Sequence, residues 1–373
     1  MSDGPRARTL QLPSSFQEIN AVFYERGWTD GLPIVPPTEN AVAEMLAWTD
    51  REPLDVVGVL PPRQGEATVE KIAINAVMAG CLPQYLPVIL AAIQAIGDER
   101  FNPDGVQATT HPVAPLLIVN GPIGRELNIN SGYNCFGQGS RANATIGRAV
   151  RLVMMNVGGG LPGSGDRSTQ GSPAKYTYCI AENEAENPWQ PLHVELGFEA
   201  ETSTVTVCGC EGPHNIQDHY SNTGEGILKT IAGAMGQAGS NNILGHGHPV
   251  LTLGPEHAAT IARDGYSKAD VKQFVFENAR YPVSKLGYEF THGVLDRLNS
   301  FDPDDPTAMC RIVERAEDLL VIVAGGSGKH SSWQPTFGGM TGPVTLPLAL
   351  KDGRPARLIE EFRRGGASTP PPR

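Results

Sequence analysis

Short apolar runs recur along the chain, and each ends at a glycine or proline with polar residues close behind it. A run of this kind, bounded by turn residues, is typical of a strand that is buried on both faces. Four of them predict strands, at residues 115–123 (PLLIVNGPI), 204–215 (TVTVCGCEGPHN), 249–258 (PVLTLGPEHA) and 318–332 (DLLVIVAGGSGKHSS).

Other segments have the apolar spacing of amphipathic or buried helices. They span residues 16–26, 38–48, 66–81, 83–98, 140–159, 224–237 and 267–280. Thr38 and Thr68 stand where a side-chain oxygen can cap the start of a helix, and Gly80 stands where a helix would end. Ser267 and Asp270 have the spacing of a capping box.

Alternation of strands and helices predicts an α/β fold with a largely parallel sheet in two lobes. We expect a flexible tail at residues 1–15, an N-terminal α/β lobe at 16–175, a C-terminal α/β lobe at 176–350 and a second tail at 351–373. The glycine-rich segment 158–176 is expected to be a loop over a site or a mobile lid. The likeness between 115–123 and 249–257 suggests an internal duplication.

Composition narrows the class of protein. The chain has 373 residues with 40% hydrophobic and 18% charged residues, which indicates a globular protein. Its formal net charge of −11, without any Lys/Arg-rich run, argues against nucleic-acid and membrane-surface partners. No apolar run reaches the length of a membrane span, so we expect a cytoplasmic protein whose six cysteines are reduced. A homo-oligomer is expected as the commonest state.

Side chains that can do chemistry cluster around the ends of the predicted strands. Because ligands bind beyond the carboxyl ends of strands in open α/β sheets, we expect these side chains to converge. They are Asn120 at the first strand; Cys208, Cys210, His214, Asp218 and His219 at the second; His257 at the third; and Lys329, His330 and Ser331 at the fourth. Histidines after three of the four strands favour one shared site over separate polar turns.

The second strand ends in the densest group of these residues. Cys208 and Cys210 face the same side of a strand, and together with His214 and His219 they offer ligands for a divalent metal, with zinc favoured. The Cys-x-Cys spacing departs from that of structural zinc sites, so burial of both thiols is the competing interpretation. Asp218 can orient an imidazole for metal binding or for proton transfer.

Two glycine-rich segments predict an anion site. In residues 324–332 (AGGSGKHSS) the glycines allow backbone amides to face an anion, and a lysine adds charge. In residues 134–148 (NCFGQGSRANATIGR) two glycines precede a helix start, with a plain helix start as the alternative interpretation. The residues expected to bind substrate are Asn120, Ser140, Arg141, Asn143, Arg148, Lys329 and Ser331.

Several stretches together resemble a family of bacterial proteins. They are WTDGLPIVPPT (28–38), ATVEKIAINAVMAGC (67–81), GSRANATIGRA (139–149), GPEHAATIARDGYSKADV (254–271) and VAGGSGKHS (323–331). Some members of that family are linked or fused to a small domain with a Sec/Cys-Gly-Ser-Cys motif, the UGSC type of selenoprotein. The resemblance covers roughly residues 25–350 and implies an enzyme with redox chemistry. This chain lacks the Cys-Gly-Ser-Cys motif, so the resemblance implies a separate thiol or selenoprotein-like partner.

Three functions are open at this point. The first is an enzyme that hydrolyses or lyses a small, anionic substrate by metal-assisted or acid/base chemistry. Its catalytic residues would be His214, Asp218, His219, His257 and His330. The second is a thiol-dependent oxidoreductase that uses Cys208 or Cys210 with the separate partner. The third is a non-catalytic protein that binds a small molecule.

Overall fold

The structure is a computed structural model that describes residues 7–291 and 305–364. Its α-helices are α1 (Phe16–Glu25), α2 (Glu39–Leu46), α3 (Val69–Ala79), α4 (Leu86–Ile96), α5 (Pro103–Gln107), α6 (Pro122–Glu126), α7 (Arg141–Asn156), α8 (Leu192–Glu195), α9 (Gly224–Met235), α10 (Asn241–Gly245), α11 (Pro255–Arg263), α12 (Lys268–Asn278) and α13 (Tyr288–Phe290). Its strands are β1 (Val56–Leu60), β2 (Gly65–Thr68), β3 (Ala114–Asn120), β4 (Cys179–Ala181), β5 (Thr204–Cys210), β6 (His214–Gln217), β7 (Val250–Leu253), β8 (Arg280–Pro282), β9 (Met309–Arg311), β10 (Leu320–Val323), β11 (His330–Gln334) and β12 (Val344–Pro347).

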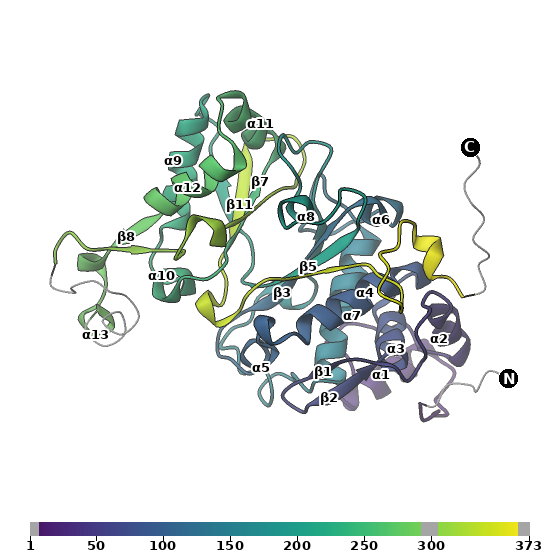
Figure 1. The fold of residues 1–373 in the computed structure, drawn as a ribbon. Helices are drawn as coiled ribbons and strands as arrows, with labels where there is room; N and C mark the ends of the chain where they lie inside the picture. Colours follow the sequence, from purple (N-terminus) through teal and green to yellow (C-terminus); the bar gives the residue numbers. More distant parts are fainter. Residues whose placement is uncertain (1–6, 292–304, 365–373) are drawn as a thin grey trace, which may run out of the picture.

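Two four-stranded sheets pack against each other at the centre of the molecule (Figure 1). The first has the strand order β4-β3-β5-β12 and the second has the order β10-β7-β11-β6. Successive residues of a strand point to opposite faces. Leu116 and Ile118 of β3 therefore face the second sheet, while Leu117 and Val119 share a core with α3, α4 and α7.

An inter-sheet core joins the two sheets. It includes Cys208 and Cys210 from the first sheet and Val250 and Ile322 from the second. The outer face of the second sheet is covered by α9, α11 and α12, which share a separate core with β7, β10 and β11. Apolar contact between neighbouring layers thus produces the order helix, sheet, sheet, helix.

The same four-strand arrangement occurs twice. In the first sheet, β3 is parallel to β4 and antiparallel to β5, and β5 is antiparallel to β12. In the second sheet, β7 is parallel to β10 and antiparallel to β11, and β11 is antiparallel to β6. The similar segments 115–123 and 249–257 occupy equivalent places, since each forms a strand followed by Gly-Pro and a helix.

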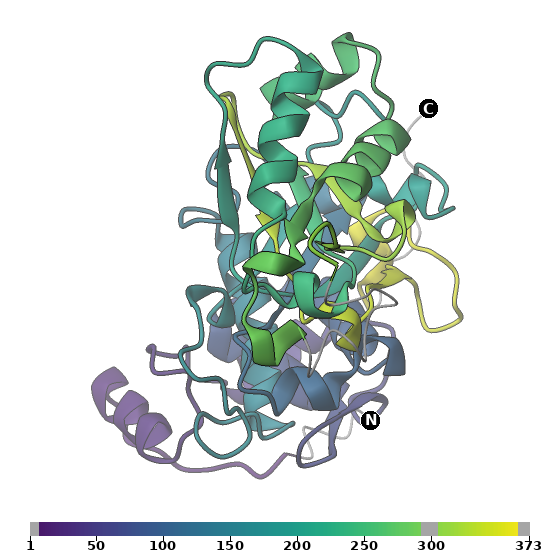
Figure 2. The same ribbon diagram turned by 90° about the vertical axis from the view of Figure 1, so that its left-hand side faces the viewer.

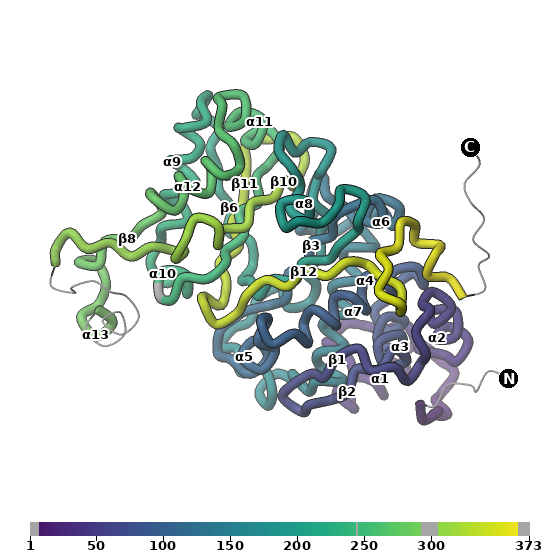
Figure 3. Tube along the Cα trace, viewed as in Figure 1, coloured from purple at the N-terminus to yellow at the C-terminus, as the bar shows by residue number. Residues whose placement is uncertain are grey.

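The fourth strands are exchanged between the two halves of the chain. β6 follows β5 in sequence but lies in the second sheet, and β12 follows β11 but lies in the first (Figure 3). A Gly-Pro pair precedes each of them, at 212–213 and at 342–343. The crossing segments bond to each other, because Glu211 N–H donates to Pro335 O at 2.7 Å and Phe337 N–H donates to Gly209 O at 3.2 Å.

The mixed α/β class is confirmed, but two finer expectations are not. Among strands of the described residues, only the β3–β4 and β7–β10 pairings are parallel. An apolar run indicates burial on both faces, and here the second covering layer is another sheet rather than a layer of crossover helices. The expected boundary at residue 175 falls inside the first sheet, so the shared core does not divide into lobes 16–175 and 176–350.

Most helix starts follow the expected capping chemistry. Thr38 accepts a hydrogen bond from the backbone of α2, and Thr68 does the same for α3. Gly80 ends α3 with φ of 87°, a conformation that glycine adopts without strain. Both hydrogen bonds of the capping box are present between Ser267 and Asp270 at the start of α12.

A buried ion pair fastens the proline-rich segment 28–38 to α7. Arg148 donates to both carboxylate oxygens of Asp30, at 2.7 and 2.8 Å, and to the carbonyl oxygen of Pro33 at 2.9 Å. Desolvation alone would raise the pKa of Asp30, but the hydrogen bonds and charge of Arg148 outweigh it and hold that pKa below its usual value. Arg148, expected to bind substrate, is thus engaged within the chain.

Both expected tails are partly packed onto the helical layer that covers the first sheet, here called the first helical layer, which contains α3, α4 and α7. Residues 350–362 add Leu350, Ile359 and Phe362 to the core that contains α3 and α4, so the expected tail 351–373 is structured up to residue 364. Residues 7–12 lie over α2 and α3, and Figure 2 shows α1, in purple, at the rim of the molecule beside them. No helix in the described ranges is long and apolar enough to cross a membrane.

Replacement of Arg148 by Ala should lower the free energy of unfolding by about 3–5 kcal/mol, because it leaves the Asp30 carboxylate buried without its partner. The side chains of Arg148 and Asp30 are 14% and 4% exposed. Urea unfolding measures the loss. The double variant Asp30→Asn/Arg148→Met should lose less than Arg148→Ala, since no unpaired charge remains. A loss below about 1 kcal/mol in Arg148→Ala would instead indicate a solvent-screened pair.

Candidate functional site

The carboxyl edge of the second sheet gathers most of the predicted chemistry. β6, β7 and β10 run in the same direction, and β11 starts where they end. The edge collects Asp218 and His219 after β6, His257 in the first turn of α11, and Lys329, His330 and Ser331 around the start of β11. Asn120 ends β3 and so lies at the edge of the other sheet.

His219 and His330 form an exposed imidazole pair. Their Nε2 atoms lie 3.0 Å apart, and the rings meet edge to face with their centroids 4.9 Å apart. Nδ1 of His330 lies 2.8 Å from Oδ1 of Asn215 on the neighbouring strand β6. Because an amide oxygen only accepts, we assign a proton to Nδ1 of His330, which leaves its Nε2 to accept a hydrogen bond from His219.

This order of donors places the hydrogen of His219 on Nε2 and leaves its Nδ1 as the unprotonated nitrogen of that ring. When Nδ1 of His219 takes up a proton, the Nε2–H of the same ring remains hydrogen-bonded to His330. The sequence indicates each histidine as a candidate. It does not indicate their contact, or the contribution of Asn215, because the two rings are 111 positions apart along the chain.

The third imidazole of the edge, that of His257, is buried. It contacts Ser331, which follows His330, and Asp218, which precedes His219. Its Nδ1 lies 2.8 Å from Oγ of Ser331, and its Nε2 lies 3.2 Å from the backbone oxygen of Asp218. The Ser331 hydroxyl donates to Nδ1 and accepts from Gly254 N–H at 3.1 Å. Desolvation lowers the pKa of His257 and keeps the ring neutral. His257 and Ser331 therefore position the edge.

Asp218 fixes the loop that carries His219. Its carboxylate makes no hydrogen bond to an imidazole among the described residues. That carboxylate accepts hydrogen bonds from the backbone N–H groups of Tyr220 (3.2 Å) and Ser221 (2.8 Å), and from the hydroxyl of Thr230 (2.7 Å). Desolvation acts to raise the pKa of Asp218, but these hydrogen bonds outweigh it and lower the pKa to about 2. Asp218 therefore does not orient an imidazole directly, as the sequence predicted, but holds the backbone of the loop that carries His219.

Lys329 points onto the same loop. Its Nζ lies 3.4 Å from the carbonyl oxygen of His219, 3.3 Å from that of Ser221 and 3.4 Å from Oδ1 of Asn222. These partners are neutral oxygens, so they orient the ammonium group without cancelling its charge. A positive charge thus stands next to the imidazole pair, where it favours a negatively charged ligand.

The carboxyl edge of the first sheet carries acidic side chains that sequence reasoning missed. Nδ2 of Asn120 donates to Glu182 at 2.7 Å and to Glu184 at 3.2 Å, and burial raises the pKa of Glu182. The two edges meet, because Asn183 N–H donates to the carbonyl oxygen of the last residue of β10 at 2.7 Å. The sequence pattern does not indicate these acidic residues as a strand end, because β4, which precedes them, is only three residues long and forms no apolar run.

A shallow groove of about 660 Å³ adjoins this edge at the start of α7, and Ser140 and Arg141 line it. Asn143 is buried and exchanges hydrogen bonds with the backbone of Asn130, so it holds the loop before the helix. Arg148 belongs to the ion pair with the proline-rich segment. Ser140 and Arg141 line this groove but also hold the fold, because Ser140 caps α7 and Arg141 donates twice to the carbonyl oxygen of Gly80, at 3.1 and 3.0 Å.

Cys208 and Cys210 are not brought to the imidazole pair. They are 1% and 0% exposed within the inter-sheet core, whereas His214 is exposed on β6 of the other sheet. Desolvation, reinforced by Cys208, raises the pKa of Cys210 well above its usual value. Across the described ranges, no group of three or more His, Cys, Asp or Glu side chains is placed to hold a metal ion.

A comparison with known protein families gives no match, and no curated protein matches the chain either. The resemblance to bacterial proteins with UGSC-type partners, and the thiol or selenoprotein-like partner that it implies, therefore stay predictions. The geometry of the edge is what supports a function.

The pH dependence of stability should reveal the buried state of His257. Because burial lowers its pKa, the unfolded chain binds a proton more readily, and stability contributed by neutral His257 is present above about pH 6.5 and is lost as the pH falls below that value. His257→Gln should be less stable at pH 7 by about 1–3 kcal/mol, and the difference should shrink below pH 6.5. Chemical unfolding from pH 5 to pH 8 measures it, with Ser331→Ala as the control that keeps the pH-dependent term.

A second titration should expose the role of Asp218. Its folded-state pKa of about 2 lies below the unfolded value, so the stabilisation is present above about pH 4 and is lost as the pH falls toward 2. Asp218→Asn should cost about 1–2 kcal/mol at pH 7 and progressively less in acid. A difference that stays constant from pH 7 to pH 2.5 would contradict this role of the carboxylate.

Proposed function

We propose that the chain is an enzyme that acts on a small, anionic substrate by histidine-based acid/base chemistry, with hydrolysis or lysis as the outcome. The observation that carries the proposal is the 3.0 Å contact between the Nε2 atoms of His219 and His330. An exposed imidazole whose other nitrogen is held by a second ring is fixed in tautomer and orientation, which suits a general base.

The pair supplies a complete proton cycle. His219 accepts a proton at Nδ1 from an attacking water or from a substrate carbon, and its Nε2–H stays bonded to His330. The same proton returns to the leaving oxygen, so the pair ends the cycle as it began. Oδ1 of Asn215 accepts a hydrogen bond from Nδ1–H of His330, and this keeps His330 in the tautomer whose Nε2 is an acceptor. His257, Ser331 and Asp218 hold the two strands and the loop that bring these rings together.

The loop between β10 and β11 supports an anionic substrate. Gly325 and Gly328 have φ of 113° and 141°, and a Cβ added at either would meet open space. The glycines are therefore required by backbone conformation, and such loops can present amide groups to an anion. Lys329 adds a positive charge on the side of the imidazole pair.

Imidazole chemistry fits this edge better than thiol chemistry. All six cysteines are buried, and the raised pKa of Cys210 is opposite to what a reactive thiolate requires. A metal-assisted form of the reaction is the second candidate, because two imidazole nitrogens that face each other can share a divalent ion such as zinc. Zinc sites in proteins usually have at least three protein ligands, which makes the metal-free form the first choice.

Turnover of small probes should depend on both rings of the pair. The probes are simple carboxylate esters, 4-nitrophenyl phosphate and small hydroxy acids, which cover hydrolysis and loss of water. We expect His219→Gln and His330→Gln to lower kcat by at least about a hundredfold. His214→Gln, a matched change on β6 outside the pair, should leave kcat within about twofold of the unchanged protein.

Metal content separates the two forms of the proposal. Elemental mass spectrometry of the untagged protein and of His219→Gln should show no stoichiometric metal if the pair acts by proton transfer alone. About one metal per chain, lost in the variant, would establish the metal-assisted form. Equal turnover by His219→Gln and by the unchanged protein, or no turnover of any probe, would count against both.

A further inference from the structure

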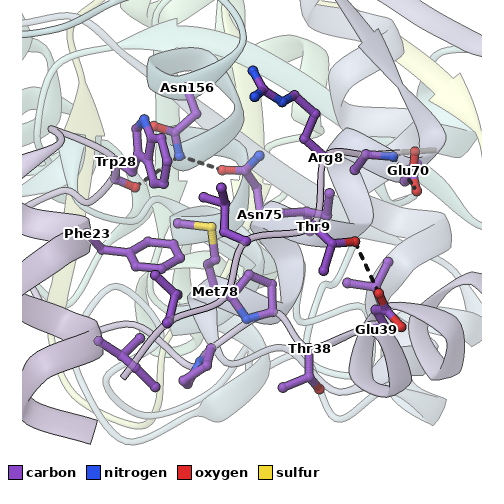
Figure 4. Close-up of a pocket in the computed structure, with 18 residues that line it drawn as sticks. Arg8, Thr9, Phe23, Trp28, Thr38, Glu39, Glu70, Asn75, Met78 and Asn156 are labelled. Atoms are coloured by element: carbon purple, nitrogen blue, oxygen red, sulfur yellow. Dashed lines mark hydrogen bonds between the residues drawn. The ribbon is translucent and has the colours of Figure 1, made fainter. Parts of the chain in front are cut away.

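A cavity of about 470 Å³ lies in the first helical layer, separate from the imidazole edge. Its walls come from α1, α2 and α3, from the proline-rich segment 28–38 and from residues 7–12 (Figure 4). This volume falls within the range of about 300–1,000 Å³ that is typical of small-molecule sites. The function proposed above leaves this space unused.

One side of the cavity is apolar and aromatic. The rings of Phe23 and Trp28 meet edge to face with centroids 5.5 Å apart, and in Figure 4 they lie on the left. Ile74 and Met78 of α3 line the same space. Arg26 covers the Trp28 ring at 4.8 Å and so fixes the indole in place. The walls are therefore preformed for a flat, apolar body.

The polar part of the cavity includes hydrogen-bond acceptors. Nδ2 of Asn156 donates to Oδ1 of Asn75 at 2.7 Å and to the carbonyl oxygen of Trp28 at 3.1 Å. Since both amide hydrogens of Asn156 are used, its side chain can offer a ligand only an acceptor oxygen. Glu39 and Glu70 lie on the right in Figure 4 and add two carboxylates.

Residues 7–12 act as a strap across the opening. Oγ1 of Thr9 donates to Glu39 at 3.1 Å, and Ala7 N–H donates to Glu70 at 3.4 Å. Leu10, which is 44% exposed, lines the cavity from this strap. These two hydrogen bonds, together with Leu12, which packs against the core of the first helical layer, hold the strap in place.

We propose that this cavity binds a small molecule with an aromatic or other flat apolar body and a cationic amino group. The body fits between Phe23, Trp28 and Met78, and the amino group faces the acceptor side. The cavity lining carries two carboxylates, Glu39 and Glu70, against the single guanidinium of Arg8, so its charge favours a cation and disfavours the anionic substrate class of the imidazole edge.

Two probes with the same apolar body test the charge preference. Isothermal titration calorimetry with 2-phenylethylamine and with phenylacetate should show the amine binding at least about tenfold more tightly. The amine should also raise Tm of the full chain, because a ligand that binds only the folded state stabilises it. Equal affinities, tighter binding of phenylacetate, or no heat with either probe would overturn the proposal.

Variants locate the bound amine. Ile74→Trp fills the cavity and should lower the affinity for 2-phenylethylamine at least about tenfold, whereas Val59→Trp adds the same side chain at a position on β1 that is 44% exposed and should leave it unchanged. Circular dichroism checks that both variants are folded. If Ile74→Trp fails to fold, Glu39→Gln at the exposed rim decides, since it should remove most of the preference for the amine. Unchanged binding in a folded Ile74→Trp would place the amine elsewhere.

Discussion

The exchange of β6 and β12 between the two sheets is the constraint on which the rest of the molecule depends. Each half of the chain supplies three strands to its own sheet and one to the other, so neither sheet is complete alone. The crossing segments then pair with each other between Gly209 and Phe337. The exchange also builds the candidate site, because β6 carries His219 from the first half to the edge where the second half presents His330.

Three histidines at one edge illustrate how environment decides the use of a residue. His257 is 0% exposed, is hydrogen-bonded at both nitrogens and is kept neutral by desolvation, so it serves as a fixed strut. His219 and His330 are exposed to solvent, and their mutual contact engages Nε2 of each ring. The buried ring holds the geometry, and the exposed pair is accessible to a ligand, which is what the proposed acid/base function requires.

Several residues with the chemistry of ligand binding are engaged in holding the chain together. Arg148 binds Asp30 through two hydrogen bonds, and Asn143 fixes the loop before α7. Arginine and asparagine suit this work for the same reason that they suit ligands, since each makes several directional hydrogen bonds. A cavity beside Trp28, which the side chains of the proline-rich segment help to line, is one of the spaces that the helices of the first helical layer leave open.

Local pattern by itself determined the longer helices with their caps, such as Thr68 and Gly80 around α3, because these depend on residues a few positions apart. It also indicated the strand ends where Asp218, His257 and His330 lie, and a likeness that corresponds to the repeated topology. Tertiary structure alone decided the strand directions, the exchange of β6 and β12, and the contact between His219 and His330. An apolar run indicates that a strand is buried but does not indicate which element covers it. The contact between His219 and His330 joins residues 111 positions apart, so the local spacing of residues cannot reveal it.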